Sequence, residues 1–139
     1  MSMFDLQGKV AIVTGAVTGL GQGMAVGLAQ AGADIVSVGI GDHSETESKV
    51  KALGRRFLGI DANLMSIEPI QSVVDKVVET FGKVDILVNN AGIIRRADAV
   101  DFTEKDWDDV MNINIKTVFF FSQAVAKQMI KQGHGGKII

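Results

Sequence analysis

The chain of 139 residues contains no cysteine and only two histidines. Without cysteine it has neither a disulfide framework nor a thiolate metal site. The two histidines, His43 and His134, are isolated and far apart in the sequence, so they do not suggest a metal site either. We therefore predict no bound metal.

An excess of positive charge is also missing, because the formal net charge at pH 7 is −2. Binding to a phosphate backbone needs a cationic face, so we expect no nucleic-acid partner. No stretch approaches the roughly 18 uninterrupted apolar residues of a membrane span. The first ten residues also lack the basic and then apolar pattern of a signal peptide. We therefore expect a cytoplasmic protein with no membrane partner.

The sequence does contain an alternation of short apolar runs with longer stretches of helical period. This alternation is typical of βαβ units, in which parallel strands alternate with helices. The length and the 47% hydrophobic content suit one domain with a core. The predicted strands are residues 10–13, 35–38, 56–60 and 84–88, and a fifth that begins at Lys137.

Three helical regions are predicted between these strands. The first covers residues 21–31. The second covers residues 70–81 and keeps one apolar face, with Ser66 as the cap and Pro69 in the first turn. The third is one helix from a Thr103 cap to about residue 132.

The first predicted strand leads into a glycine-rich turn, Thr14-Gly15-Ala16-Val17-Thr18-Gly19-Leu20-Gly21, that opens the first helix. In this position such a turn is a candidate phosphate site. Gly15 permits a tight exit from the strand, Gly19 lets the backbone approach a pyrophosphate, and Gly21 allows close packing of helix on strand. The helix N-terminus adds amide donors and partial positive charge. Taken alone, the pattern fits an ordinary glycine-rich turn equally well.

A second motif, Asn89-Asn90-Ala91-Gly92, follows the fourth predicted strand. Together with the Gly-x-x-x-Gly-x-Gly spacing of the turn, it resembles the short-chain dehydrogenase/reductase family, over the whole chain. The resemblance implies a Rossmann-like α/β fold, with a doubly wound parallel sheet of strand order 3-2-1-4-5. In that family the first motif binds a nicotinamide dinucleotide and the second lies beside the cofactor ribose. The implied cofactor-binding residues are Gly15, Thr18, Gly19, Leu20, Gly21, Asn90, Ala91 and Gly92.

The chain departs from the family at the end of the second strand. Family members usually carry an acidic residue there for the ribose of NAD, or a basic one for the extra phosphate of NADP. Here Gly39 and Ile40 occupy these positions, and the nearest acid, Asp42, either reaches the ribose or faces water. Residues 36–48 contain no Arg or Lys, so a 2′-phosphate would lack a counter-charge. We therefore predict NAD rather than NADP.

After the third strand the family commonly places an Asp beside the adenine amino group. Asn63 stands at that position here, followed by Leu64. An amide oxygen can accept the same hydrogen bond, so Asn63 is a candidate adenine contact. An ordinary turn asparagine is an equally good interpretation.

The resemblance also implies a catalytic group of tyrosine, lysine, serine and asparagine. Asn114 matches the asparagine, whose backbone carbonyl holds a water in the family's proton relay. The chain contains no tyrosine, so we expect the other three residues beyond Ile139. Residues 1–139 would then be the N-terminal, dinucleotide-binding part of a single Rossmann-type domain, truncated where the fifth strand begins.

Further segments, among them Ile94-Arg95-Arg96 and residues 104–111, resemble the sugar-acid dehydrogenases of this family. The resemblance implies a small sugar-acid substrate. Arg95 or Arg96 follows the fourth strand on the ligand-binding side of the sheet, where a guanidinium can bind a carboxylate by a bidentate pair. Surface arginines that pair with Asp98 or Asp101, or that contact another subunit, are the alternative.

Two other functions stay open: a 3-oxoacyl reductase or other alcohol dehydrogenase of the family, and a non-catalytic fragment that binds a dinucleotide. The helix of residues 103–132 bears on assembly, because it carries more apolar side chains than one buried face uses. In the family the corresponding helix packs against its copy. We therefore expect a homodimer or homotetramer through this helix, with apolar exposure near residues 119–121.

Overall fold

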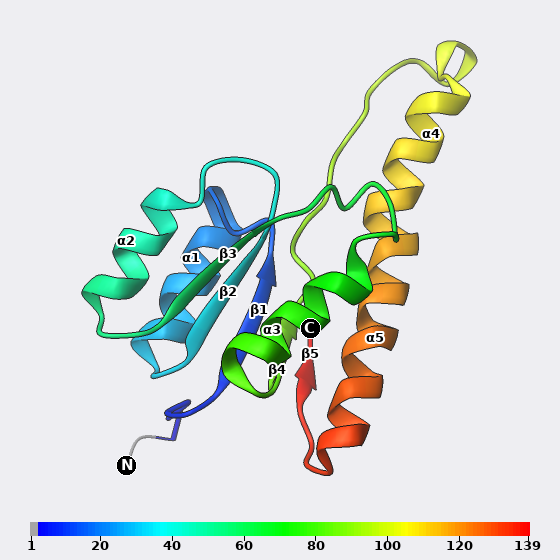
Figure 1. The fold of residues 1–139 in the computed structure, drawn as a ribbon. Coiled ribbons are helices and arrows are strands. Elements are labelled where there is room, and N and C mark those ends of the chain that lie inside the picture. Colours follow the sequence, from blue (N-terminus) through cyan, green and yellow to red (C-terminus); the bar gives the residue numbers. More distant parts are fainter. Residues whose placement is uncertain (1–2) are drawn as a thin grey trace.

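The computed structural model describes residues 3–139 as a five-stranded parallel sheet with helices on both faces (Figure 1). The strand order is β3-β2-β1-β4-β5, which confirms the predicted Rossmann-like, doubly wound fold. The order reverses between β1 and β4, and this reversal leaves a crevice at the carboxyl ends of the strands. The strands are β1 (Val10–Thr14), β2 (Asp34–Gly39), β3 (Phe57–Asp61), β4 (Ile86–Val88) and β5 (Lys137–Ile138).

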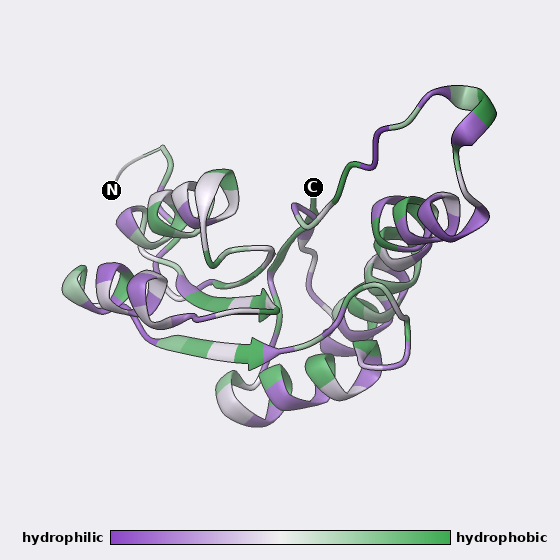
Figure 2. Ribbon diagram, turned by 90° about the horizontal axis from the view of Figure 1, so that it is seen from above, coloured by the Kyte–Doolittle hydropathy of each residue, from purple (hydrophilic) through white to green (hydrophobic). Residues whose placement is uncertain are grey.

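The central strand β1 is buried on both faces, and its side chains alternate between two cores. Val10 and Ile12 join the core formed with α3 (Ile70–Phe81) and α5 (Thr117–Gln132). The residues between and after them, Ala11 and Val13, join the core formed with α1 (Gly19–Gln30) and α2 (Ser44–Ala52). Because successive side chains of a strand point to opposite faces, helices on both sides require an unbroken apolar run. Figure 2 shows these hydrophobic strands between the helices.

Helix α2 was not predicted from the sequence. Only Thr46 and Val50 of its nine residues are buried, so it carries no apolar stripe that a periodicity argument could detect. Its signal lies instead in its charges, since acidic side chains in the first turn and basic ones in the last turn favour the helix dipole. These side chains are Glu45, Glu47, Lys49 and Lys51.

Helix α3 has the predicted apolar face and ends at Gly82, whose φ is +82°. The prediction that Ser66 caps this helix was wrong. Ser66 Oγ accepts a hydrogen bond from the Glu68 amide at 3.1 Å, in the turn that precedes the helix. Pro69 occupies the N-cap position rather than the first turn. Proline fits there because its missing N–H has no intrahelical partner to lose.

The helix predicted from Thr103 to residue 132 is present, and it contains a π-turn that the sequence did not predict (Figure 1). Helix α4 (Glu104–Met111) is followed by a π-turn, η2 (Asn112–Lys116), and then by α5. Thr103 caps α4 as predicted, because its Oγ1 accepts from the Asp106 amide at 3.1 Å. π-turns inside helices are rare and frequently mark functional sites, and this one contains Asn114.

Helix α5 divides its apolar side chains between the core and the surface. Phe121 is fully buried, whereas Phe119 is 60% exposed and Ile130 is 80% exposed. Residues two positions apart in an α-helix differ by about 200° around its axis, so Phe119 and Phe121 face opposite ways. The apolar exposure expected near residues 119–121 is therefore present at Phe119 and absent at Phe121.

Between β4 and α4 the chain leaves the sheet as an extended segment, makes the short turn η1 (Ala99–Asp101), and returns along α4 (Figures 1 and 2). Across residues 3–139, no helix is long and apolar enough to cross a membrane. The same residues contain no cluster of three or more side chains that could hold a metal ion.

Candidate functional site

A cavity of about 410 Å³ opens at the carboxyl edge of the sheet, where the strand order reverses. Open α/β sheets bind their ligands at this place. Its walls come from the turns after four successive strands and from the π-turn η2. The lining residues are Gly15, Val17, Thr18, Gly39, Ile40, Ala62, Asn63, Leu64, Met65, Asn90, Ala91, Gly92, Ile93 and Ile113.

The turn after β1 has glycine where the backbone leaves no room for a side chain. Gly15 has a φ of +66°, and a Cβ on it would lie 3.0 Å from the Cα of Ala91. A Cβ on Gly21 would overlap the carbonyl oxygen of Gly15. The close packing of helix on strand that was expected at Gly21 is therefore present.

Gly19 is a different case, because a Cβ on it would meet no atom within 4 Å. It is the first residue of α1, and its φ is +59°. The backbone at this helix N-terminus is thus open to a ligand. Of its two neighbours, Thr18 lines the cavity and makes no side-chain capping bond, while Leu20 is exposed outside the lining.

Thr14 and Asn90 join the glycine turn to the segment after β4. Thr14 Oγ1 accepts hydrogen bonds from the amides of Asn90, at 3.0 Å, and Ala91, at 2.9 Å. Asn90 Nδ2 donates to the carbonyls of Thr14, at 3.1 Å, and Gly15, at 3.2 Å. These bonds hold the two motifs in one arrangement on either side of the crevice.

Asn114, in η2, binds the same segment from the other side. Its Nδ2 donates to the Ile93 carbonyl at 2.9 Å, and its Oδ1 accepts from the Ile93 amide at 3.1 Å. Gly92 makes this approach possible, since a Cβ there would lie 2.8 Å from Asn114 Oδ1. The side chain of Asn114 therefore holds the backbone that continues the Asn-Asn-Ala-Gly motif.

The loop after β3 forms a further wall of the cavity, with Asn63 and Leu64 in it. Asn63 Oδ1 accepts from the Met65 amide at 3.0 Å, as in an ordinary asparagine turn. The oxygen has a second lone pair, so this bond still leaves it able to accept from a ligand. The Leu64 carbonyl accepts from the buried Thr117 Oγ1 at 2.6 Å, which ties this wall to the start of α5.

At the end of β2, Gly39 and Ile40 line the cavity and Asp42 does not. The Asp42 carboxylate accepts a hydrogen bond from the Ser44 amide at 2.9 Å, at the N-terminus of α2. This bond lowers the pKa of Asp42 below its ordinary value. The Asp42 side chain therefore forms an Asx turn directly before His43, the N-cap residue of α2.

The first basic residue after β2 is Lys49, and it is already bound elsewhere. Its Nζ donates to Gln22 Oε1 at 3.0 Å and lies 3.3 Å from a carboxylate oxygen of Glu45. The end of β2 thus lines the cavity with Gly39 and Ile40, and the lysine nearest to it along the chain is already paired.

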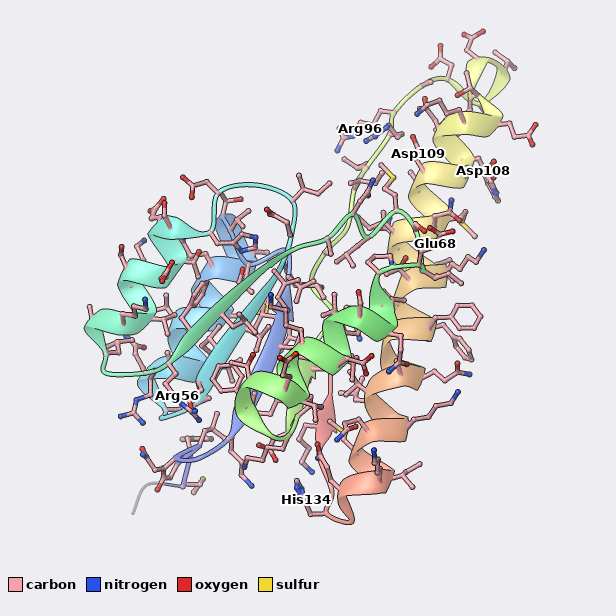
Figure 3. The ribbon with its side chains drawn as sticks, in the orientation of Figure 1. Arg56, Glu68, Arg96, Asp108, Asp109 and His134 are labelled. Carbon is pink, nitrogen blue, oxygen red and sulfur yellow. The ribbon has the colours of Figure 1, made fainter. Side chains whose placement is uncertain are left out.

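The two arginines after β4 have different surroundings. Arg95 lies 3.7 Å from a carboxylate oxygen of Asp106 and 3.8 Å from one of Asp109, so it pairs with α4. The partners that were considered for it, Asp98 and Asp101, are not the ones it has. Arg96 is exposed on the extended segment beside α4 (Figure 3), and within residues 3–139 it contacts no carboxylate.

Residues 9–139 match the family model described as short chain dehydrogenase. The chain belongs to the short-chain dehydrogenase family. A relative named 2-dehydro-3-deoxy-D-gluconate 5-dehydrogenase, from Dickeya dadantii (strain 3937), is 66% identical over 139 residues, which are all of this chain and 55% of the relative. The chain thus spans about half the length of the curated relatives it matches.

Two solved short-chain dehydrogenases share the fold closely. One, provisionally described as a 2-deoxy-D-gluconate 3-dehydrogenase from Agrobacterium tumefaciens with bound NADP, is 43% identical with a TM-score of 0.86, and the match covers 99% of this chain and 54% of that one. Another, from Mycobacterium paratuberculosis and bound to NAD, is 35% identical with a TM-score of 0.90 and coverages of 96% and 55%. Structural relatives of this chain therefore include proteins with either dinucleotide.

Four residues in or beside this site were not identified from the sequence as site residues: Thr14, His43, Asp61 and Thr117. Small polar residues at the carboxyl ends of strands are a signal for Thr14 and Asp61, because those ends meet at the crevice. No pattern identifies Thr117, since its partner is a backbone carbonyl 53 positions away in the sequence. For His43, the only prediction from the sequence was that it does not bind a metal ion.

Two glycines of α1 provide a matched test of the packing between turn and helix. Gly21→Ala is expected to lower the free energy of unfolding by about 1–3 kcal/mol, because the added methyl group meets the Gly15 carbonyl. A Cβ on Gly23 would meet no atom within 4 Å. Gly23→Ala is therefore expected to raise the free energy of unfolding by about 0.5–1 kcal/mol. Urea unfolding followed by circular dichroism measures both, and equal effects would contradict this account of the turn.

Proposed function

We propose that this chain is the dinucleotide-binding part of an NAD-dependent oxidoreductase that acts on a hydroxyl or carbonyl group of a sugar acid. The observation that carries the proposal is the open backbone of Gly19 at the N-terminus of α1, directly after Thr18, which lines the cavity. A helix N-terminus offers amide donors and partial positive charge to a pyrophosphate. The backbone at Gly19 is free of neighbouring atoms within 4 Å of a Cβ position, so this helix N-terminus fits a pyrophosphate.

The cavity suggests how the cofactor would lie. The pyrophosphate would bind along Gly15–Gly21, with the adenine beside Asn63 and Leu64 and the nicotinamide toward Asn90 and Asn114. This order follows the lining, since the β2 and β3 ends border one side of the glycine turn and the β4 end borders the other. The nicotinamide, when bound, supplies hydride transfer.

NAD is favoured over NADP by the charges at the end of β2. Asp42 is exposed there, and Lys49 is held by Gln22 and Glu45. A 2′-phosphate bound here would meet carboxylates rather than the fork of donors that an arginine offers. Asp42 itself can contact the ribose only if its carboxylate gives up its bond to the Ser44 amide.

Asn114 is the one residue of the family's catalytic group with a match in this chain. We propose that its backbone carbonyl serves the proton relay, while its side chain holds Ile93 in place. The chain has no tyrosine, and a tyrosine beside a lysine is the family's acid/base group. Residues 1–139 are therefore expected to bind the dinucleotide without turnover by themselves.

A sugar acid is favoured as the substrate class over a 3-oxoacyl group. The relative with 66% identity is named for a sugar-acid substrate. Arg96 offers a guanidinium without a carboxylate partner among residues 3–139, three positions after Ile93 of the cavity wall. A carboxylate substrate needs such a partner. The pairing of Arg95 with α4 leaves Arg96 as the residue for this role and gives Arg95 the task of holding the segment.

We further propose that the dehydrogenase assembles as a homodimer or homotetramer through residues 103–132. The support is the outer face of α5, where Phe119 and Ile130 are exposed. Burying a large apolar side chain contributes roughly 1.5–3 kcal/mol, so a symmetric contact that covers this face in two copies would be favourable.

Titration calorimetry of the 139-residue chain tests the cofactor site. NAD⁺ is expected to bind more tightly than NADP⁺. Gly19→Ala should weaken NAD⁺ binding about tenfold or more, because its Cβ would occupy the open space at this helix N-terminus and a φ of +59° disfavours a side chain. Gly23→Ala is the matched control that should bind normally. If the unaltered chain does not bind NAD⁺, the proposed cofactor site is wrong.

Substrate recognition is tested in a form extended to include the family's serine, tyrosine and lysine. Arg96→Ala should raise KM for a sugar-acid carboxylate at least tenfold more than for its uncharged amide, since a buried charge-assisted bond contributes about 1.5–3 kcal/mol. Arg96→Lys should recover part of the loss. Arg95→Ala should affect the two substrates equally, through the position of the segment. Equal effects of Arg96→Ala would make Arg96 structural.

Assembly is tested by sedimentation velocity at micromolar concentration. The chain is expected to form dimers or tetramers. Phe119→Asp should raise the dissociation constant roughly a hundredfold or more, because the charge would enter the apolar contact in each copy. Val100→Asp, at an apolar position of η1 that is also exposed, should leave assembly unchanged. A monomeric unaltered chain, or equal assembly of the unaltered chain and Phe119→Asp, would show that α5 is not an interface.

A further inference from the structure

The imidazole of His43 lies between the ends of β2 and β3, with a side chain only 12% exposed. Its Nδ1 lies 2.8 Å from Ser37 Oγ. Its Nε2 lies 3.2 Å from the Gly39 carbonyl oxygen and 3.3 Å from Asp61 Oδ1. No role in the site proposed above has used this residue.

These contacts determine which nitrogen carries the proton in the neutral ring. A carbonyl oxygen and a carboxylate can only accept, so Nε2 must be the donor to both. Nδ1 then accepts from the Ser37 hydroxyl. His43 therefore bridges the Gly39 carbonyl and the Asp61 carboxylate through one N–H group.

The space that holds the ring is built into two adjacent strands. Ser37 and Gly59 are register partners in β2 and β3, and Gly39 and Asp61 are the partners two residues further on. Ser37 is fully buried. A Cβ on Gly59 would lie 3.1 Å from the Cβ and the Cγ of His43. The Ser37 hydroxyl on β2 and the lack of a side chain at Gly59 on β3 thus leave both a hydrogen-bond partner and room for the imidazole.

The bridge ends at the wall of the proposed cofactor site. Gly39 lines the cavity, and its carbonyl also accepts from the Ala62 amide at 3.3 Å, where Ala62 is a second lining residue. Gly39 and Gly41 both have positive φ, at +154° and +121°. This turn lacks side chains of its own that could fix it, so the His43 contact is the one that anchors its carbonyl from the α2 side.

Asp61 adds a charge at this place. Its side chain is 82% exposed, and the contact with His43 holds Oδ1 beside the strand end where Gly39 stands. The family's acid at the end of β2 is replaced here by Gly39 and Ile40. The carboxylate of Asp61 enters the same region from the neighbouring strand, together with that of Asp42.

We propose that His43 is a positioning residue for the adenosine end of the dinucleotide, which holds the Gly39 turn for the ribose and holds Asp61 where its carboxylate repels a 2′-phosphate. The inference rests on the proposed cofactor site and names the residues that select the dinucleotide there. Asp61 acts through charge, and His43 acts through position.

The test uses the 139-residue chain with ADP-ribose and its 2′-phosphate as probes in titration calorimetry, because both lack the nicotinamide and report on this end alone. The unaltered chain should bind ADP-ribose more tightly. If it binds neither probe while NAD⁺ also fails to bind, the proposed function fails. If it binds ADP-ribose, the variants below decide the further inference by itself.

Asp61→Asn should leave ADP-ribose binding within about twofold and tighten binding of the 2′-phosphate about twofold to fivefold, the range expected for an exposed charge. The gain should shrink with added salt, since exposed charges are screened. Asp108→Asn, which removes an exposed carboxylate on α4 away from β2 and β3 (Figure 3), is the matched control and should change neither affinity. An equal change for both probes would overturn the role given to Asp61.

His43→Phe should weaken both probes about threefold to tenfold, which corresponds to the loss of one hydrogen bond to the turn. His43→Gln keeps an amide donor and should recover part of that affinity, which a merely structural role would not predict. Thermal unfolding of each variant is measured beside the affinities. If both His43 variants have a lowered unfolding midpoint but unchanged affinity for the two probes, the inference is overturned. Asp61→Asn tests the inference without changing a buried side chain.

Discussion

The hydrogen bonds between Thr14 and Asn90 are the constraint on which the crevice depends. They join the ends of β1 and β4, the two strands between which the sheet order reverses. Strand ends that diverge at a reversal leave a gap, and backbone groups that line a gap need partners. Here side chains supply the partners, so the gap keeps its width and its amides keep their direction. Gly15 is required by the same contact, because a side chain there would force the two segments apart.

The parts of the fold that could be predicted are those in which burial alone decides the pattern. The strands are short apolar runs because helices cover both faces of the sheet, and α3 shows one apolar face because its other side meets water. Helix α2 escaped prediction because it buries only two side chains, while its charges and the Asp42 turn that precedes it favour the helix. The π-turn between α4 and α5 escaped it too, since residues 112–116 contain no glycine or proline and the residues next to the turn keep α-helical dihedral angles.

The candidate site divides in a similar way. Glycines and the Asn-Asn-Ala-Gly motif could be found because their spacing along the chain is itself the signal, and most of the predicted cofactor residues line the cavity. His43 and Asp61 could not, because their meeting depends on the register of β2 against β3, which no local pattern states. The two arginines after β4 are equivalent in the sequence, and only the position of α4 separates a paired Arg95 from an exposed Arg96.

The π-turn at Asn112–Lys116 also limits how the length of this region can vary. A π-turn holds one residue more than an α-turn, so α4 and α5 can keep their mutual orientation if one residue is deleted here and the turn closes to an ordinary α-turn. Phe121 would then stay in the core. What the deletion would cost is the position of Asn114, whose side chain reaches the Ile93 backbone from within the wider turn. The extra residue of this turn is therefore kept for the contact between Asn114 and Ile93 and not for the packing of the helices.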